Sequence, residues 1–234
     1  MKTFHFSVIM LFISLSLAAQ ESFVGAWQNQ NGDVTSVRVF SDGFFSVAVY
    51  KKQEFVSTYG GKYKQDGKAL AEIIEFDTQT PANVGKEFPQ KISWNKGEWS
   101  IADQPASYKR LDNGSPGKLA GAWLITGRFN NGELRKNTPG ARRTMKILSG
   151  TRFQWIAYNV ETKEFFGTGG GTYTTENGKY TENIEFFSRD NTRVGASLGF
   201  DFSIMDDEGW RHSGKSSKGD PIDEIWTKRE KLGM

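Results

Sequence analysis

The sequence has no cysteine and only two histidines among its 234 residues. It can therefore form no disulfide, present no thiolate nucleophile or cysteine-ligated metal, and carry no lipid on a cysteine. Its 30 Lys and Arg residues nearly balance its 27 Asp and Glu residues, and the basic residues are scattered and form no runs. This pattern does not favour a nucleic-acid partner. We expect no metal and no cofactor, and a fold that depends on its hydrophobic core alone.

A long apolar run occurs only at the N-terminus. Residues 1–19 have one basic residue, Lys2, followed by an apolar segment from about Phe6 to Leu17 and then small residues. This is the pattern of a cleaved secretory signal peptide, and the segment is shorter than the roughly 20 residues that a membrane-spanning helix needs. We therefore predict a periplasmic or secreted protein that is not a lipoprotein and does not insert into the membrane after cleavage. An uncleaved anchor is the alternative.

The rest of the chain contains one series of short motifs twice. Phe23-Val-Gly-Ala-Trp27 recurs as Leu119-Ala-Gly-Ala-Trp123, and Glu72-Ile-Ile-Glu-Phe76 recurs as Glu182-Asn-Ile-Glu-Phe186. The matches keep their order along the chain, which predicts a duplication. We divide the chain into a signal peptide (1–19), copy one (20–111), a linker of turn-forming residues (112–118) and copy two (119–231).

Each copy predicts a succession of short strands with little room for helix. Turn formers such as Asp42-Gly43 separate the candidate strands, and Val37 and Val39 show the alternation that buries one face of a strand. The candidate strands of copy one are 23–29, 34–41, 43–50, 54–64, 69–77, 87–94, 98–102 and 106–110. Antiparallel strands joined in order close most economically into an up-and-down barrel, because closure removes unpaired edges. We therefore predict an all-β protein of two tandem antiparallel barrels.

Copy two follows the same plan with two longer loops, from about Arg128 to Gly140 and from about Ser213 to Pro221. Longer loops at one end of a barrel often build a binding mouth, although a tolerated insertion is an equal alternative. Gly167-Thr-Gly-Gly-Gly171 lacks the Gly-Lys-Ser/Thr of a phosphate-binding loop and is followed by a strand. It predicts a bulged or sharply bent strand.

Gly25-x-Trp27 and Gly121-x-Trp123, which open the first strand of each copy, resemble the Gly-x-Trp signature of lipocalins and their relatives. In that superfamily a basic residue of the last strand packs across the tryptophan where the barrel closes. The resemblance places Arg110 and Arg229 in this role, as a structural cation–π contact.

Copy two is also similar, over nearly its whole length, to secreted bacterial lipocalin-like domains of unassigned activity. The resemblance implies two lipocalin-like barrels and supplies no reaction. It rests on Phe153-Gln-Trp155, Gly169-Gly-Gly-Thr-Tyr173, Tyr180-Thr-Glu-Asn-Ile-Glu185, Trp210-Arg-His-Ser-Gly214 and Asp223-Glu-Ile-Trp226.

His212 is the only imidazole outside the predicted signal peptide, and copy one has no counterpart to it or to Glu224. Strand alternation places His212 on the face of Trp210, and Glu224 on the face of Trp226. We predict that His212, Glu182 and Glu224 approach one cavity of copy two, as an acid–base or polar recognition cluster. The alternative is a cross-strand pair of His212 and Glu224 near the rim, with little energetic weight.

Aromatic residues of copy two could stack on a flat or apolar ligand in this cavity. Arg142 could clamp a carboxylate or sulfate at the mouth, although such a residue usually marks a solvated face. The candidate ligand-binding residues are Trp155, Tyr173, Tyr180, Trp210, His212, Glu224 and Arg142.

Glycosidases use a pair of carboxylates for catalysis, and this sequence contains two such pairs, Glu72/Glu75 and Glu182/Glu185. Their spacing does not suit that role. Residues three apart on a strand point to opposite faces, so neither pair can converge on one bond. We expect them to hold turns or to pair with basic residues of neighbouring strands.

These observations favour an exported protein whose second barrel binds a small apolar, aromatic or glycan-derived ligand, beside a tightly filled first barrel. One alternative is a hydrolase, lyase or isomerase acting on a small glycan or lipid, using His212 with Glu182 or Glu224. Another is an adaptor or assembly protein without a ligand. The oligomeric state is left open.

Overall fold

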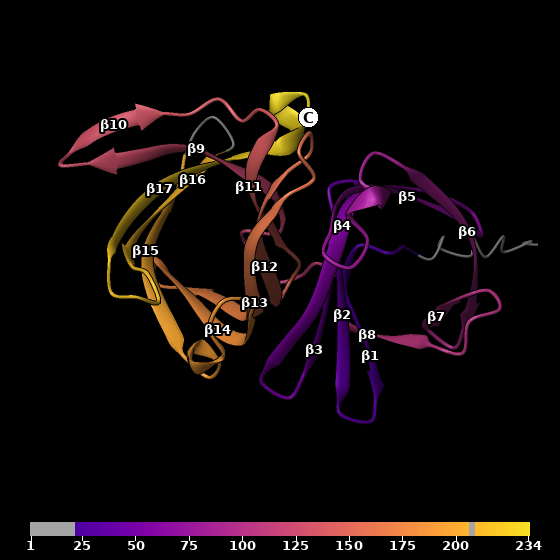
Figure 1. Ribbon diagram of the computed structural model, residues 1–234. Coiled ribbons are helices and arrows are strands. Elements are labelled where there is room, and N and C mark those ends of the chain that lie inside the picture. Colours follow the sequence, from indigo (N-terminus) through magenta and orange to yellow (C-terminus); the bar gives the residue numbers. More distant parts are fainter. Residues whose placement is uncertain (1–21, 206–208) are drawn as a thin grey trace, which may run out of the picture.

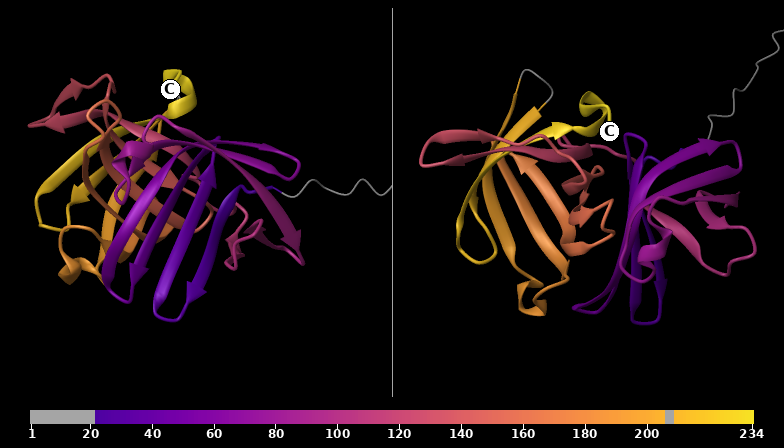
Figure 2. Two further views of the ribbon diagram at one scale, coloured as in Figure 1. Left: turned by 45° about the vertical axis from the view of Figure 1, so that its right-hand side comes forward. Right: turned by 45° about the horizontal axis from the view of Figure 1, so that its top comes forward.

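A computed structural model describes residues 22–205 and 209–234 as two antiparallel β-barrels packed side by side (Figures 1 and 2). The predicted signal peptide lies outside the described residues. Among the described residues, no helix has the length and hydropathy needed to cross a bilayer.

Barrel one is closed by eight strands in sequence order, with β8 pairing back onto β1. The strands are β1 (Gly25–Asn31), β2 (Val34–Ser41), β3 (Phe44–Lys51), β4 (Glu54–Asp66), β5 (Ala69–Asp77), β6 (Glu87–Asn95), β7 (Glu98–Ile101) and β8 (Ser107–Asp112). The short 3-10 helix η1 (Pro81–Asn83) joins β5 to β6. All eight predicted strands are confirmed, and β8 continues into the first residue of the predicted linker.

Barrel two repeats this plan, and β9 pairs with both β11 and β17 to close it. Its elements are β9 (Gly121–Asn130), β10 (Glu133–Lys136), β11 (Arg142–Leu148), β12 (Arg152–Asn159), β13 (Phe165–Glu176), β14 (Lys179–Phe187), η2 (Asn191–Arg193), β15 (Ser197–Ile204), β16 (Gly209–Lys215), β17 (Pro221–Lys228) and η3 (Arg229–Leu232). The predicted loop over 128–140 is partly strand, because β9 turns back as β10 to form a hairpin that projects from the barrel (Figure 1). The second predicted loop shortens to residues 216–220.

The glycine-rich segment of β13 is a bulge, as predicted. The pairing of β13 with β14 shifts register between Gly170 and Gly171, and β4 shifts register at the matching Gly60 and Gly61. A Cβ atom on Gly171 would lie 2.0 Å from the carbonyl oxygen of Asn183. Only glycine allows so close an approach of the neighbouring backbone where the barrel bends.

A cation covers the first tryptophan of each barrel, but only one of the two cations was identified from the sequence. Arg110 Cζ lies 3.9 Å from the centre of the Trp27 ring, as expected. The assignment of Arg229 to the second barrel was wrong. Lys228 pairs with Trp123 across β17 and β9, and its Nζ lies 5.6 Å from that ring centre. Arg229 lies one residue beyond the end of β17.

The two barrels pack through equivalent faces, as in a symmetric dimer. The matching pairs Tyr50/Phe55 and Tyr158/Phe165 make Tyr50 and Tyr158 equivalent positions. Tyr50 donates a hydrogen bond to Glu185 of barrel two at 2.8 Å, and Tyr158 donates one to Glu75 of barrel one at 2.7 Å. The apolar part of this junction includes Val37, Val39, Ala48 and Phe76 of barrel one, and Met145, Ile147, Ile156 and Phe186 of barrel two.

The glutamate pairs point to opposite faces of their strands, as predicted. Glu72 and Glu182 pair inside their barrels with Arg38 and Lys146, each at 2.7 Å. Glu75 lies in the junction, where Arg229 donates two hydrogen bonds of 2.9 Å to its carboxylate. Burial raises the pKa of Glu75, but the hydrogen bonds and charge of Arg229, together with the hydrogen bond of Tyr158 and the charge of Arg143, outweigh it and hold the pKa below its usual range.

Candidate functional site

Barrel two encloses an open pocket of about 400 Å³. Buried polar and aromatic side chains form its inner part, and apolar and aromatic side chains form its walls. Exposed residues of β9, of the segment after β14 and of the turn between β16 and β17 lie at its mouth. The lining residues are Arg128, Thr144, Lys146, Trp155, Ala157, Glu182, Ile184, Phe187, Arg189, Leu198, Phe200, His212, Ser216, Ser217, Lys218, Ile222, Glu224 and Trp226.

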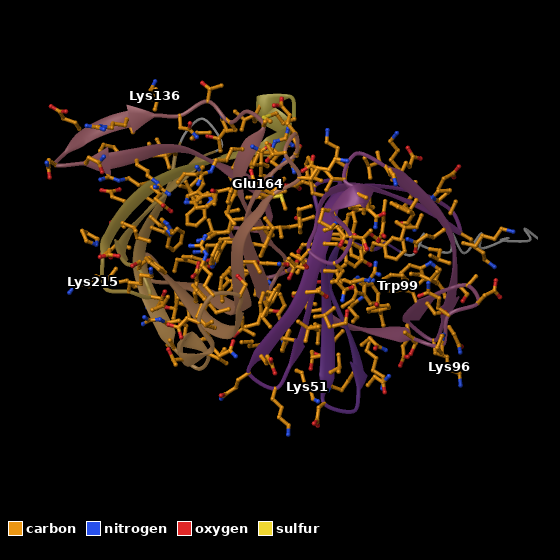
Figure 3. All side chains as sticks on the ribbon, in the orientation of Figure 1. Lys51, Lys96, Trp99, Lys136, Glu164 and Lys215 are labelled. Carbon is orange, nitrogen blue, oxygen red and sulfur yellow. The ribbon has the colours of Figure 1, made fainter. Side chains whose placement is uncertain are left out.

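In the corresponding part of barrel one, Arg38 takes the position of Lys146 and Tyr59 takes the position of Gly169. Arg38 donates to Tyr59 at 2.5 Å and to Glu72 at 2.7 Å, and its Cζ lies 5.3 Å from the centre of the Trp99 ring. Trp99 lies inside barrel one in Figure 3, and it is 1% exposed. The charged group of barrel one is therefore enclosed by aromatic rings.

A tyrosine-to-glycine difference explains why barrel two stays open beside its tryptophan. Strand pairing sets Tyr59 opposite Val47 in barrel one, and Gly169 opposite Trp155 in barrel two. A Cβ atom on Gly169 would lie 2.8 Å from Trp155 Nε1 and 2.8 Å from Phe187 Cδ2. Gly169 thus leaves room for the indole and phenyl rings that form one wall of the pocket.

A buried ion pair forms part of the inner end of the pocket. Lys146 Nζ lies 2.7 Å from Glu182 Oε1, and the Tyr180 hydroxyl donates to the same oxygen at 2.7 Å. Burial, reinforced by the charge of Glu182, raises the pKa of Tyr180 well above its usual range, so its hydroxyl remains a donor. Lys146 Nζ also lies 5.0 Å, 5.5 Å and 5.0 Å from the ring centres of Tyr180, Trp210 and Trp226.

A second polar chain runs from the interior to the mouth. His212 Nε2 lies 3.0 Å from Glu224 Oε2, and Glu224 Oε1 lies 3.1 Å from the Arg128 guanidinium. Burial lowers the pKa of His212, the charge of Lys146 lowers it further, and the opposing effect of Glu224 is smaller. Burial raises the pKa of Glu224, but the hydrogen bond from His212 and the charges of His212, Lys146 and Arg128 together outweigh this and lower it. The pair is therefore a neutral imidazole donating Nε2–H to a carboxylate.

His212 should make the protein less stable in mild acid. Because its pKa in the folded protein is below the ordinary 6.5, the unfolded chain binds a proton first as the pH falls below 6.5. Each unit of that depression removes about 1.4 kcal/mol from the free energy of unfolding. Urea unfolding of the wild type at about pH 7, 6 and 5 should show this loss, and His212→Asn should give a flatter profile. Parallel profiles would contradict the assignment.

The structure brings four of the candidate residues into the pocket lining: Trp155, Glu182, His212 and Glu224. Three other candidates are buried in the core of barrel two and do not line the pocket: Tyr173, Tyr180 and Trp210. Tyr173 donates to the carbonyl of Ser149 at 2.6 Å, so its hydroxyl has a structural partner.

Arg142 lies outside the barrel pocket. Its Cζ is 4.6 Å from the centre of the Phe166 ring, and it lines an adjoining groove of about 450 Å³ beneath the β9–β10 hairpin. Lys146 was not predicted from the sequence as a site residue, although it occupies the strand position that Arg38 has in copy one. It also missed Arg189 and Lys218, whose positions depend on connections that no periodicity describes.

Within residues 22–205 and 209–234, no cluster of three or more His, Asp and Glu side chains is placed to hold a metal ion. No protein-family model matches the chain, and no curated protein matches it. The pocket of barrel two is therefore the feature from which function is inferred.

Proposed function

We propose that this is an exported, lipocalin-like protein that binds a small ligand in its second barrel. The observation that carries the proposal is an open pocket of about 400 Å³ in barrel two, where Gly169 takes the position that Tyr59 has in barrel one. Pockets for small ligands are typically of about 300–1,000 Å³ and combine apolar walls with a few placed polar groups.

The lining supports binding of a ligand with an aromatic or apolar body. The rings of Trp155 and Phe187 meet edge to face, with centroids 5.6 Å apart. Phe200 stacks on the His212 imidazole at 4.9 Å, which leaves an aromatic surface beside the ion pairs. Such surfaces provide large contact areas for flat molecules, while the few polar groups set their orientation.

An enzyme is the second candidate, because His212 and Glu224 are within hydrogen-bond distance at an open pocket. The His212 ring is only 1% exposed, and its Nδ1 has no hydrogen-bond partner in the described part of the chain. No hydroxyl nucleophile of the described residues is therefore hydrogen-bonded to the imidazole. The hydrogen bond between His212 and Glu224 orients these two side chains only. The geometry favours recognition over catalysis.

An adaptor without a ligand is supported less well. It requires a filled second barrel and a continuous exposed apolar patch. Among the residues that the structure describes, the large apolar side chains that are exposed come from different segments of the chain: Val24, Val34, Val56, Leu111, Leu134 and Ile204.

Native mass spectrometry of the protein purified from its own cells tests the proposal. We expect a discrete small-molecule adduct on the wild type that is absent from Trp155→Ala, whose pocket wall is removed, and retained by Trp94→Ala in barrel one. An adduct retained by Trp155→Ala would place the ligand elsewhere. An adduct that changes mass on incubation of the wild type, but not of His212→Asn, would support the enzyme.

A further inference from the structure

The mouth of the barrel-two pocket carries excess positive charge. The lining of the whole pocket includes four cations (Arg128, Lys146, Arg189 and Lys218) and two carboxylates (Glu182 and Glu224). With His212 neutral, four positive minus two negative charges leave a net charge of +2. Lys146 is neutralised by Glu182, and Arg128 by Glu224, so the excess belongs to the two remaining cations.

Arg189 and Lys218 have no carboxylate partner among the described residues. The Arg189 guanidinium donates to the backbone carbonyl of Phe166, which fixes the side chain across Gly167 without cancelling its charge. The exposed Lys218 lies in the turn between β16 and β17, where Ser216 accepts a hydrogen bond from its backbone nitrogen. Both cations therefore stand at the mouth with their charge available to a ligand.

The adjoining groove strengthens the same field. It shares Arg128 and Thr144 with the pocket, and its lining contains Arg135, Lys136, Arg142 and Arg143 but no carboxylate. Of these four, Arg143 alone has an ion pair within the described parts of the chain, with Glu75 at 3.1 Å. Cations gathered around a concave, partly water-excluded mouth raise the local concentration of anions.

These cations are not shared by the two copies, so a common scaffold role does not explain them. The 110-residue offset that aligns Glu72 with Glu182 places the neutral Gln79 where copy two has Arg189. Lys218 lies in the connection 216–220, and the equally long connection between β7 and β8, residues 102–106, contains no lysine or arginine. Arg189 and Lys218 therefore belong to the copy that has the open pocket.

From this arrangement we infer the class of ligand: an aromatic anion, whose ring system lies between Trp155, Phe187 and Phe200 and whose carboxylate, sulfonate or phosphate group meets Arg189 and Lys218. This inference rests on the proposed function and adds the charge of the ligand to it. Lys146 and Arg128 already pair with the carboxylates of Glu182 and Glu224, so an anionic group of a ligand finds unpaired cations at the mouth. A guanidinium and an ammonium at one mouth suit a group with several oxygen atoms.

Three naphthalene derivatives of matched size test the charge: 2-naphthoate, neutral 2-naphthamide and cationic 2-naphthylmethylammonium. Isothermal titration of the mature protein at low ionic strength should show about tenfold tighter binding of 2-naphthoate than of 2-naphthamide, and the weakest binding for the cation. The advantage of the carboxylate should shrink in about 0.5 M salt, because screening acts on exposed charges.

The double variant Arg189→Gln/Lys218→Gln should lose about tenfold in affinity for 2-naphthoate and change by less than about twofold for 2-naphthamide. Its control is Lys51→Gln/Lys215→Gln, which removes the same charge from exposed lysines outside the pocket (Figure 3). The control should keep the affinity of the wild type for both compounds.

Equal affinities for naphthoate and naphthamide would overturn the inference and leave the ligand-binding proposal standing. Equal losses in the two double variants would also overturn it, since net charge alone would then explain the preference. If none of the three compounds bound and no adduct were found on the native protein, the proposed function would fail as well.

Discussion

Replacing Glu75 with glutamine should lower the free energy of unfolding by about 3–5 kcal/mol, because it leaves a buried cation without a counter-ion. The Arg229 side chain is 0% exposed and donates both of its short hydrogen bonds to Glu75. Arg143 and Tyr158 converge on the same carboxylate, at 3.1 Å and 2.7 Å. A neutral amide can accept one or two of these bonds but cannot balance the charge.

The pseudo-symmetric position supplies the control. Glu185→Gln makes the same change on the equivalent strand of barrel two, where the carboxylate is 33% exposed and is paired with a single arginine, Arg152. Solvent compensates that site, so we expect a loss of about 1 kcal/mol. Urea unfolding of the three proteins gives the comparison, and equal losses at both sites would show that the Arg229 contact does not hold the junction.

The junction also predicts how the two barrels unfold. Glu75 of barrel one contacts side chains of β11, β12 and η3, and the apolar residues around it come from both copies. The barrels share one core at this face, so the wild type should unfold in a single cooperative transition. The Glu75→Gln variant should therefore also unfold in one transition, with both barrels losing stability together.

The barrel architecture could be predicted from the sequence because duplication doubles every local signal. The Gly-x-Trp starts, the turn formers and the alternation within single strands repeat in order, and they depend only on neighbouring residues. The same alternation placed Glu182, His212 and Glu224 on the inward face, and the structure brings all three to one pocket. Alternation is reliable here because a shift of one residue in strand register would move the apolar side chains of the whole strand from the core to the solvent.

The remaining features depend on register and on contacts between distant segments. Arg229 was matched to Arg110 by residue type, whereas the pairing of β17 with β9 places Lys228 there and sends Arg229 to the junction. Tyr173 and Trp210 face inward, but alternation does not say how deep in a barrel a residue lies. The cations at the mouth come from connections, whose conformation follows from no periodic pattern.

Filling the pocket should nearly abolish ligand binding without unfolding the protein. Ala157 faces the pocket from β12, two residues from Trp155, and Ala157→Trp would place a second indole in the open space. Because the space is empty of side chains, the new ring has room and the cost in stability should be below about 1.5 kcal/mol. The affinity for 8-anilinonaphthalene-1-sulfonate should fall by about a hundredfold, since the ligand would have to displace a bulky side chain.

A surface tryptophan is the matched control for that variant. Val56 is 47% exposed on β4 of barrel one, and Val56→Trp adds the same side chain without approaching the pocket. Its affinity for the probe should equal that of the wild type. Retention of full affinity by Ala157→Trp would place the probe outside barrel two.

The central claim is that barrel two, and not barrel one, is the ligand-binding unit, and the indole N–H signals of one NMR spectrum test it most directly. Trp155 and Trp226 line the pocket, whereas Trp27 and Trp99 are buried in barrel one. On titration with 8-anilinonaphthalene-1-sulfonate, we expect shifts of the Trp155 and Trp226 signals, while those of Trp27 and Trp99 stay in place. Shifts confined to Trp27 and Trp99, or no shift in any of the four signals, would contradict it.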